Sequence, residues 1–552
     1  MSSMSTRWNG WGENGRSFSL IDRPHFWPSL LRRIGAWSED VAPPVSLEQV
    51  SMPDHVLEPA LFDRLARASA QLLTDRESRI RHACGKSYRD LVRLRSGAIA
   101  TAPAAVAVPR THDQVRELLR VAAEARLPVV PFGGGTSVVG GVEGPSGPYL
   151  ALSLRGLDRL ISLDPLSRVA HLEAGMLGPE VEAALGQQGF TLGHFPQSFE
   201  FSTLGGWIAA RSAGQQSTRY GKIEDMVVSL RVATPAGDLE TPVVPASSEG
   251  PDLNRVLAGG EGALGVITEA WLRVHPSPAA RHHVGVLLPD FESGIGAIRT
   301  LMQSGGRPAT FRLSDASETE ATFAMRTTSP SRLQSAAAAV VKRWLGPMEG
   351  RCLLIAGFEG TGAEVRIQRA AAGKALKAAR AVSLGAGVGR EWFAHRFDLP
   401  YLRDVLLDRG VMVDTLETAT TWSNLENLHG AVTRALQQSL EAWGTPAWVF
   451  CHVSHAYEVG ASLYFTFAAR QDRERPIAQW QAAKIAATEA IVASGGALSH
   501  HHGIGRDTAP WLGARLKEGG MALLKGVKEG VDPSGVMNPG VFGLGTRGDS
   551  GR

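Results

Sequence analysis

Three separate clusters of glycine constrain this chain more than any other feature of its sequence. They occupy residues 133–135, 205–206 and 259–265, next to segments with the patterns of strands or helices. Glycine inside an element is about 0.5–1 kcal/mol less favourable than alanine. Three clusters spaced by roughly 60 to 70 residues would therefore be costly as ordinary turns. A long ligand that lies against the backbone explains all three together.

The composition narrows the class of protein. Glycine makes up 62 of 552 residues without a Gly-X-Y period, which excludes collagen, and the 43% apolar and 20% charged residues are typical of a globular protein. The net charge of +3 is too small for a nucleic-acid-binding tract, so we expect no nucleic-acid partner. Cys84, Cys352 and Cys451 lack CxxC spacing, which favours buried thiols in a reducing compartment. No run reaches the ~18 apolar residues of a membrane span and no secretory signal is visible, so we expect a cytoplasmic location.

The order of the patterns predicts an α+β protein. After a polar N-terminal extension that is partly helical, from Leu61 to Leu91, short apolar runs alternate with a helix that begins after Thr111, as in a β-α-β unit. The expected regions are 1–100, 101–277, 278–495 and 496–552. The strands expected before residue 277 are 105–108, 128–132, 149–154, 168–173, 226–233 and 265–274, with a helix at 179–188.

Residues 278–495 have the pattern of an α/β cap domain. Alanine-rich helices are expected at 335–345 and 367–382, and strands at 352–358 and 462–467. In the N-terminal extension, residues 26–37 are aromatic and basic, a composition that suits peripheral contact with a membrane surface. Packing of this short segment on the main body is the other interpretation.

Residues 131–137, Pro-Phe-Gly-Gly-Gly-Thr-Ser, can form an anion-binding nest at the end of a strand. Without Cβ atoms, the glycines can turn their amides inward around an anion such as pyrophosphate. The segment has neither the lysine of a Walker motif nor the Gly-x-Gly-x-x-Gly spacing of a dinucleotide-binding site. A P-loop and a Rossmann site are therefore disfavoured.

The three clusters together resemble the PCMH-type FAD-binding domain of the vanillyl-alcohol oxidase superfamily, and more closely the alkyldihydroxyacetonephosphate synthase family of ether-lipid synthesis. The resemblance covers residues 8–12, 131–137, 193–207, 220–225, 261–269, 401–404 and 498–503. It implies a two-subdomain FAD-binding domain with an α/β cap domain, and FAD held non-covalently, consistent with a first glycine loop without histidine. The residues expected to bind FAD are Pro131, Gly133, Gly134, Gly135, Thr136, Ser137, Gln197, Ser198, Ser202, Thr203, Gly205, Gly206, Glu261, Gly262, Gly265, Val266 and Ile267.

Three consecutive histidines follow Ser499 and precede Gly503. In an extended segment, His500 and His502 face one side and His501 faces the other. A His-x-His pair can also bind zinc or manganese. The resemblance instead makes His501 a general acid or base near the flavin, with His500 and His502 orienting it or the substrate, and we expect no metal.

Tyr464 lies in the strand-like run 463–467. Alternation by itself favours a core strand with one polar tip. The resemblance makes Tyr464 a catalytic tyrosine that exchanges a proton with the substrate.

Arg312 and Arg403 carry planar guanidinium groups that suit a phosphate or carboxylate. For a single arginine, pairing with a nearby carboxylate is the ordinary expectation, here with Asp315 or Asp404. The resemblance makes both arginines substrate-binding residues.

Some positions depart from the family pattern. Gln197 stands where the family usually has aspartate, and His452 stands where it has arginine. The Gly-His-x-Gly-Asp-Gly-Asn-x-His pattern of related metal-dependent 2-hydroxyacid dehydrogenases is also broken, because this chain has His452 and His455 in Cys-His-Val-Ser-His. Gln197 and His452 bear on the identity of the substrate more than on flavin binding.

The resemblance implies an FAD-dependent enzyme that exchanges the acyl chain of acyl-dihydroxyacetone phosphate for a fatty alcohol, with no net redox change. The expected partners are a lipid-like phosphate and a fatty alcohol, and we expect a homodimer. The alternative is an FAD-linked oxidase or dehydrogenase of a 2-hydroxy acid such as lactate, glycolate or 2-hydroxyglutarate. A flavin-binding protein without turnover is a third interpretation, against which Tyr464 and the three histidines argue.

Overall fold

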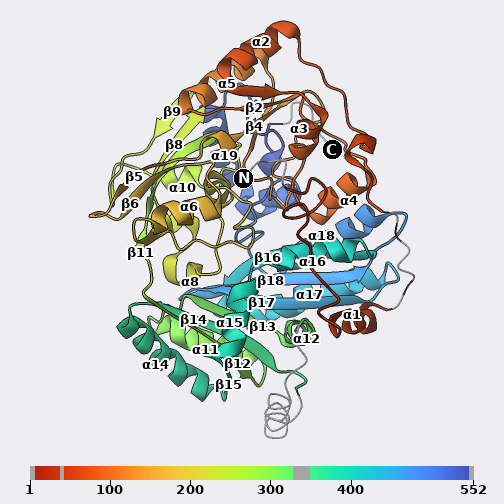
Figure 1. Ribbon diagram of the computed structural model, residues 1–552, viewed down its shortest axis with the longest axis vertical. Helices are drawn as coiled ribbons and strands as arrows, with labels where there is room; N and C mark the ends of the chain where they lie inside the picture. Colours follow the sequence, from red (N-terminus) through yellow and green to blue (C-terminus); the bar gives the residue numbers. More distant parts are fainter. Residues whose placement is uncertain (1–5, 36, 38–40, 42, 327–347, 546–552) are drawn as a thin grey trace.

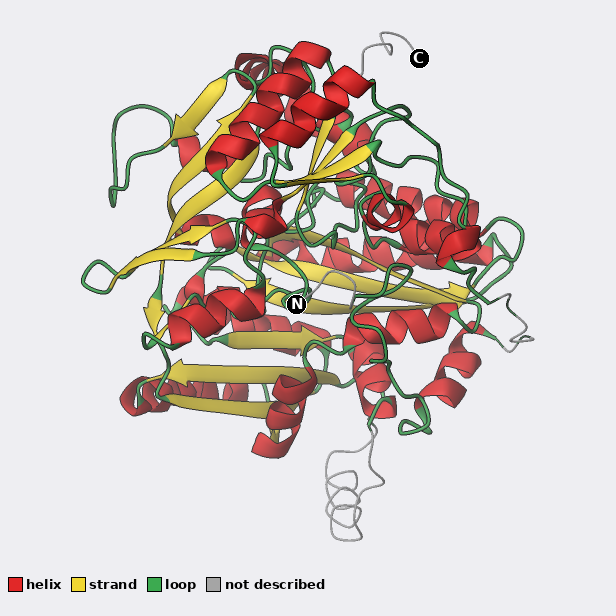
Figure 2. Cartoon of the chain, turned by 45° about the horizontal axis from the view of Figure 1, so that its top comes forward, coloured by secondary structure: helices red, strands yellow, loops and turns green. Residues whose placement is uncertain are grey.

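The computed structural model describes residues 6–35, 37, 41, 43–326 and 348–545. Two sheets with their helices fill the upper half of the molecule in the view of Figure 1, and a seven-stranded sheet with its helices fills the lower half. Figure 2 shows helices and strands mixed along the chain, which confirms the expected α+β class. None of the described helices is long and apolar enough to cross a membrane.

The first sheet has the strand order β1-β2-β4-β3. The parallel strands β2 (Ala105–Val108), β4 (Leu150–Ser153) and β3 (Val129–Phe132) match the expected ones. Helix α5 (His112–Ala125) connects β2 to β3, and the hydroxyl of Thr111 accepts a hydrogen bond from the Gln114 amide at its start, as predicted.

The antiparallel edge strand β1 (Gln71–Leu73) was not predicted. It lies between α2 (Pro59–Ala68) and α3 (Arg76–Arg81), which α4 (Tyr88–Ser96) follows, inside the segment expected to be helical. Its pairing with β2 crosses the expected region boundary at residue 100. Three residues have too little local pattern to indicate a strand, and pairing with a distant partner decides their structure.

The second sheet is antiparallel, with the order β5-β6-β10-β8-β9. Its strands are β5 (Leu160–Asp164), β6 (Val169–Glu173), β10 (Val266–Arg273), β8 (Val227–Thr234) and β9 (Gly237–Glu240). Helices α6 (Gly178–Gly186) and α7 (Leu204–Ala210) precede β8 in the chain. Ala233 of β8 and Val266 of β10 belong to the apolar core of the first sheet, so the two sheets pack as two joined subdomains.

The seven-stranded cap sheet has the order β15-β12-β14-β13-β17-β18-β16. Its outer half consists of β15 (Val382–Gly385), β12 (Ala280–Leu288) and β14 (Cys352–Gly360). Its other half consists of β13 (Thr310–Ser314), β17 (Ala447–Ala456), β18 (Gly460–Arg470) and β16 (Val411–Thr421), which carry Arg312, His452, Tyr464 and Val413 of the cavity wall. Four long helices pack against strands of this sheet: α11 (Phe291–Gln303), α14 (Gly362–Ala378), α17 (Leu425–Glu441) and α18 (Pro476–Ala493).

One expected cap helix, at 367–382, is shifted. The helix α14 begins at Gly362, where Thr361 caps it, and it ends at Ala378 because Val382 begins the edge strand β15. The helix expected at 335–345 lies outside the described residues.

The N-terminal segment packs on the cap. Phe26, Leu30 and Ile34 on one side of α1 (Phe26–Ile34) are buried against β16, β17, β18, α12 (Ala316–Ala324) and α16 (Leu399–Leu407). Packing on the main body therefore accounts for the apolar side of this segment.

The C-terminal segment returns to the first sheet. After α19 (Ala509–Val531), the Val129 amide of β3 donates to the Val536 carbonyl, and the Asn538 amide donates to the Val129 carbonyl, both at 2.8 Å. The run after α18 also brings residues 500–502 to Glu417 of the cap strand β16, and Lys222, which precedes β8, donates to the His500 carbonyl.

Candidate functional site

A cavity of about 590 Å³ lies where the three glycine clusters meet the cap sheet. Its size is within the usual range for small-molecule sites, about 300–1,000 Å³. Every residue that the sequence analysis expects to bind FAD lies on its wall, and so do Arg312, Arg403, Tyr464, His501 and His502. Of the predicted site residues, only His500 is not on the wall.

The glycines allow the three loops to pack on one another. A Cβ on Gly134 would lie 1.7 Å from the carbonyl oxygen of Phe201, in the segment of the second cluster. Gly262 has φ +75°, and its Cβ would lie 2.9 Å from Pro131 beside the first cluster. Glycine is therefore required at both positions so that the loops can contact each other. This role was not predicted from the sequence. The result is a wall of closely approaching backbone, and such a cradle fits an extended cofactor such as FAD.

Several polar residues that precede the second glycine cluster hold the cavity wall in place. Thr203 caps α7 by accepting from the Gly206 amide at 3.3 Å. Ser202 accepts from the Trp207 indole at 2.6 Å and from Ser198 at 3.0 Å. The Gln197 side chain donates to the Arg396 carbonyl at 2.7 Å, which ties this loop to the cap.

The Glu261 carboxylate is committed to the C-terminal segment. It accepts the Ile504 amide at 2.6 Å and the Gly505 amide at 2.8 Å. Burial raises the pKa of Glu261 to about 7, although the two amides oppose this effect. Asn538 holds the same region by donating to the carbonyl of Glu261 at 2.7 Å.

The three histidines do not form an extended strand, so their expected alternation is wrong. The amides of His500, His501 and His502 all donate to the carboxylate of Glu417, at 2.5, 3.2 and 2.9 Å. Successive amides of a strand point in opposite directions, so one carboxylate can bind three of them only where the backbone curves around it. The Ser499 hydroxyl donates to the same carboxylate at 2.6 Å.

This curvature separates the three imidazoles. His501 and His502 face the cavity, with ring centres 5.9 and 5.6 Å from that of Tyr464. His500 turns away, and its Nε2 lies 2.6 Å from the Tyr457 hydroxyl. The expectation that His500 and His502 share a side is therefore incorrect.

The Glu417 carboxylate and the neighbouring imidazoles differ in their state of ionisation at neutral pH. Burial opposes ionisation of Glu417, but the three histidines, which carry positive charge when protonated in acid, and the Ser499 hydroxyl outweigh it and hold the pKa of Glu417 well below its ordinary value. Burial lowers the pKa of His501 well below its usual 6.5 and also lowers that of His502. At neutral pH an ionised carboxylate thus lies among neutral imidazoles.

Tyr464 lies on the face of β18 opposite its large apolar side chains. Leu463, Phe465 and Phe467 are buried on the other face of β18, as the alternation predicts. The Tyr464 hydroxyl donates to Thr415 at 3.1 Å, and burial raises the pKa of the phenol to about 12. A protonated phenol therefore faces the cavity at neutral pH.

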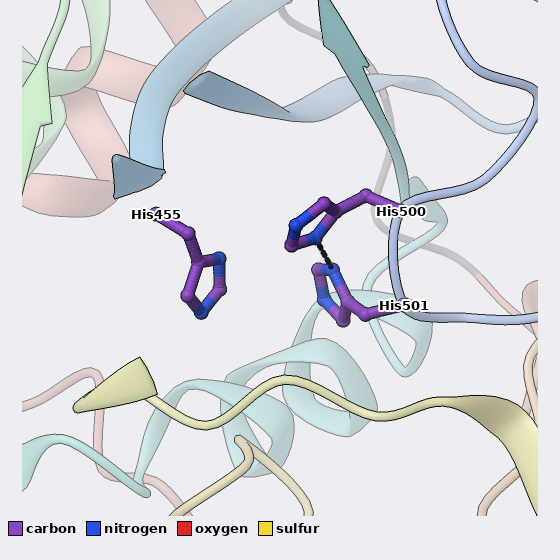
Figure 3. Close-up of side chains that lie close together, drawn as sticks. All are labelled: His455, His500 and His501. Atoms are coloured by element: carbon purple, nitrogen blue, oxygen red, sulfur yellow. Dashed lines mark hydrogen bonds between the residues drawn. The ribbon is translucent and has the colours of Figure 1, made fainter. Parts of the chain in front are cut away.

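The alternative use of the histidines as metal ligands has a geometric basis. Nitrogens of His455, His500 and His501 lie within 4.8 Å of one another, and Figure 3 shows the three rings. Each ring already has a protein partner: the Nδ1 atoms of His500 and His501 are 2.9 Å apart, and Nε2 of His455 is 2.8 Å from the Gly214 carbonyl. A cation would have to displace these hydrogen bonds.

Arg312 is paired, but not with the residue expected from the sequence. Its guanidinium donates to Glu318 at 2.7 Å and contacts Nδ1 of His452 at 3.1 Å, while Asp315 binds His429 and the Cys451 amide. Burial would raise the pKa of Glu318, but Arg312 and His452 lower it to about 2. The charge of Arg312 is thus balanced within the protein.

Arg403, unlike Arg312, is not paired with a carboxylate among the described residues. Its neighbour Asp404 is buried; the Asp404 carboxylate forms an ion pair with Arg7 at 3.1 Å and accepts from the Trp11 amide at 2.7 Å. Among the residues that the structure describes, Arg403 has no hydrogen-bond or ion-pair partner, and its Nε is buried. Its charge is available to a ligand.

Two parts of the cavity were not predicted from the sequence. Arg396 lines it with its guanidinium over the rings of Phe393 and Phe397, at 3.8 and 4.4 Å, and burial lowers its pKa to about 10. An apolar end is lined by Phe18, Phe26, Leu30, Met325, Leu402, Leu406, Val413 and Phe450. The aromatic segment 26–37 was the only sequence signal for this end.

The chain matches two families of known domains. Residues 103–241 match the FAD binding domain, and residues 277–542 match the C-terminal domain of FAD linked oxidases. These matches confirm the predicted FAD-binding fold and FAD as the cofactor.

Individual proteins match over nearly the whole chain. Alkyldihydroxyacetonephosphate synthase of Dictyostelium discoideum is 34% identical, covering 97% of this chain and 92% of the relative, and that of Trypanosoma brucei brucei is equally similar with the same coverage. A solved structure of an alkyldihydroxyacetonephosphate synthase has a TM-score of 0.85 at 32% identity, covering 97% of this chain and 98% of the other. The glycolate oxidase subunit GlcD of Bacillus subtilis is more distant, at 25% identity over 79% of this chain and 88% of the relative.

Proposed function

Because the chain belongs to the family of alkyldihydroxyacetonephosphate synthases, we propose that it exchanges the acyl chain of acyl-dihydroxyacetone phosphate for a fatty alcohol. The bond between the ketone-bearing fragment and the carboxylate breaks, a new bond to the alcohol oxygen forms, and the products are alkyl-dihydroxyacetone phosphate and a fatty acid. The proton of the alcohol passes to the carboxylate that leaves. No electrons are gained or lost overall, so the exchange is redox-neutral.

The shape of the cavity carries this proposal. One part has the unpaired Arg403 with Tyr464 and His501, and another part is apolar, with Phe26, Leu30 and neighbouring side chains. A substrate with a phosphate head and a long chain matches both parts. A short 2-hydroxy acid would leave the apolar part without a ligand.

FAD fits the wall formed by the three glycine clusters, and it would lie there non-covalently, since residues 131–137 contain no histidine. When bound, FAD supplies an electron-accepting ring system at which the substrate carbon is activated. The protein supplies the orientation of both ligands and the groups that move protons.

Tyr464 and His501 are the proposed proton-transfer groups. With its raised pKa, the Tyr464 phenol oxygen holds a proton that it can donate. The His501 imidazole is neutral, and its Nδ1 lies 2.9 Å from Nδ1 of His500; in the tautomer in which His501 donates this hydrogen bond, its Nε2 is the basic atom. His502 and His500 would hold this ring in place.

Arg403 and Arg312 would bind the phosphate. Arg403 supplies an uncompensated charge, whereas Arg312, held by Glu318 and His452, supplies directed N–H groups. His452 thus stands in the substrate region, where its replacement of an arginine would reduce the positive charge.

We further propose a cytoplasmic homodimer with peripheral membrane contact. Ile21 is 92% exposed near cavity residues Phe18 and Arg23, and Arg32 and Arg33 are exposed on α1. Such side chains suit the boundary of an anionic membrane. Flotation with anionic vesicles and light scattering of the purified protein test the two proposals separately.

The activity is tested by incubating the flavin-loaded protein with acyl-dihydroxyacetone phosphate and labelled hexadecanol. We expect labelled alkyl-dihydroxyacetone phosphate in amounts that exceed the enzyme. A fully flavin-loaded protein that yields no ether product would refute the proposal.

Oxidation of a 2-hydroxy acid is less well supported, since the glycolate oxidase relative is more distant than the synthases. Anaerobic addition of lactate, glycolate or 2-hydroxyglutarate should leave the visible flavin band unchanged. Bleaching of the band would favour the alternative.

A further inference from the structure

A turn at the N-terminus reaches the cavity from outside the two matched domains. Thr6 and Glu13 form an antiparallel bridge, and the Arg7 amide donates to the Gly12 carbonyl at 2.7 Å. Lys86 donates to the carbonyls of Arg7 and Trp8, at 3.3 and 3.1 Å. These hydrogen bonds hold the turn in a defined position in the fold.

Asp404 fixes this turn against helix α16. The buried Asp404 carboxylate accepts from the Arg7 guanidinium and from the Trp11 amide. Gly12 lies against the ring of Tyr401, where a Cβ would come within 2.1 Å of a ring carbon. The same helix carries Arg403, so the turn and the unpaired arginine are held in a fixed relation.

Trp11 places its indole on the cavity wall. The residue is 6% exposed, and its ring packs edge-on against Phe201 with centres 5.6 Å apart. Its buried Nε1–H has no acceptor among the described residues. Buried indole N–H groups ordinarily have a partner, because an unsatisfied buried donor is costly. The indole N–H is thus a candidate donor to a ligand in the cavity.

The residue before Asp404, to which the Trp11 amide is bound, indicates the kind of acceptor. Arg403 also lines the cavity with a buried Nε that lacks an acceptor, and it forms no ion pair with Asp404, whose Oδ2 binds the Arg7 guanidinium and the Trp11 amide. A neutral N–H and an unpaired guanidinium together suit a phosphate oxyanion.

We propose that the Trp11 indole N–H is a substrate-binding donor, which with Arg403 binds the phosphate group of the substrate. The N-terminal turn would then complete the site that the two flavoprotein domains leave open. This inference rests on the proposed function for the identity of the phosphate compound. The phosphates of FAD have the same chemistry, so the experiment must separate the two sources.

The test uses the full-length, flavin-loaded protein and dihydroxyacetone phosphate as the probe. Trp11→Phe keeps an aromatic ring at this position and removes the N–H together with the five-membered ring that carries it. Trp443→Phe is the matched control, because Trp443 packs with Arg475 and is not on the cavity wall. Binding is measured by calorimetry, flavin content by absorbance, and KM with acyl-dihydroxyacetone phosphate.

We expect Trp11→Phe to weaken probe binding and raise KM roughly tenfold, the effect of one hydrogen bond to a charged group. Flavin content and kcat should change little, and Trp443→Phe should match the wild type. Trp11→His, which restores a ring N–H, should recover part of the affinity, as mere packing would not.

Three results would overturn the inference. The first is unchanged probe binding and KM in Trp11→Phe. The second is loss of flavin with unchanged probe binding, which would assign the donor to FAD. The third is equal weakening in Trp11→Phe and Trp11→His, which would assign the effect to packing. Because probe binding does not require turnover, a wild-type protein that binds the probe but makes no ether refutes only the proposed function.

Discussion

Glu417 and Tyr464 lie directly opposite each other on the antiparallel strands β16 and β18. Side chains of opposed residues share one face of a sheet, so the carboxylate that gathers the three histidine amides lies beside the phenol. The same register places His452 of β17 on the other side of Tyr464, with ring centres 5.0 Å apart. The pairing of three strands thus assembles the cap side of the site.

Glu417→Gln should lower both activity and stability. The amide replaces an anion that accepts four hydrogen bonds, and each buried donor left unsatisfied costs about 1–3 kcal/mol. We expect loss of activity by at least tenfold, measured as kcat, and a lower free energy of unfolding in urea. Glu364→Gln, at an exposed helix start, is the control.

The effect of Glu417 on stability should depend on pH. Its pKa is lower in the folded protein than its ordinary value near 4.5, so its contribution is complete above that pH and declines as the pH falls below it. The stability difference between wild type and Glu417→Gln should therefore shrink in acid. A difference that stays constant from pH 7 to pH 3 would contradict this.

Tyr464→Phe and His501→Asn should each reduce kcat by about 10²–10⁴-fold, the usual range for removal of a general acid or base. Flavin should remain bound, because neither residue belongs to the glycine clusters. Because burial keeps the pKa of His501 well below 6.5, its protonation should not reduce the rate between pH 6.5 and 8. Rate measurements over that range, together with flavin absorbance, check these expectations.

Gly134→Ala should prevent assembly of the FAD-binding wall. The added methyl group would overlap the Phe201 carbonyl, and a backbone atom cannot move aside without displacing the second cluster. We expect a protein with little flavin per chain. Gly147→Ala is the matched control, since no atom lies within 4 Å of its Cβ position, and it should bind flavin normally.

Arg312→Leu and Arg403→Leu should act differently. Removing Arg312 leaves the buried Glu318 carboxylate without its charge partner, which costs about 3–5 kcal/mol of stability. Removing Arg403 breaks no pair, so it should raise KM while the unfolding midpoint in urea changes little. Equal destabilisation by both substitutions would contradict the assignment of Arg403 as the unpaired cation.

The sequence by itself determined the FAD-binding fold and the location of its loops. Strand and helix patterns depend on residues close together in the chain, and most expected strands appear within one or two residues of their predicted ends. The exceptions, such as β1 and the end of α14, depend on distant pairing or on the start of an edge strand.

Only the tertiary structure decided the partner of each charged or polar group. Proximity in the sequence predicts Asp315 and Asp404 as partners of Arg312 and Arg403, but Arg312 binds Glu318, and Asp404 binds the Trp11 amide from 393 residues away. Likewise, Glu417 reaches the histidine amides across more than 80 residues. Electrostatic and hydrogen-bond energies depend on distance in space, so sequence separation gives little indication of which arginine is left free for a ligand.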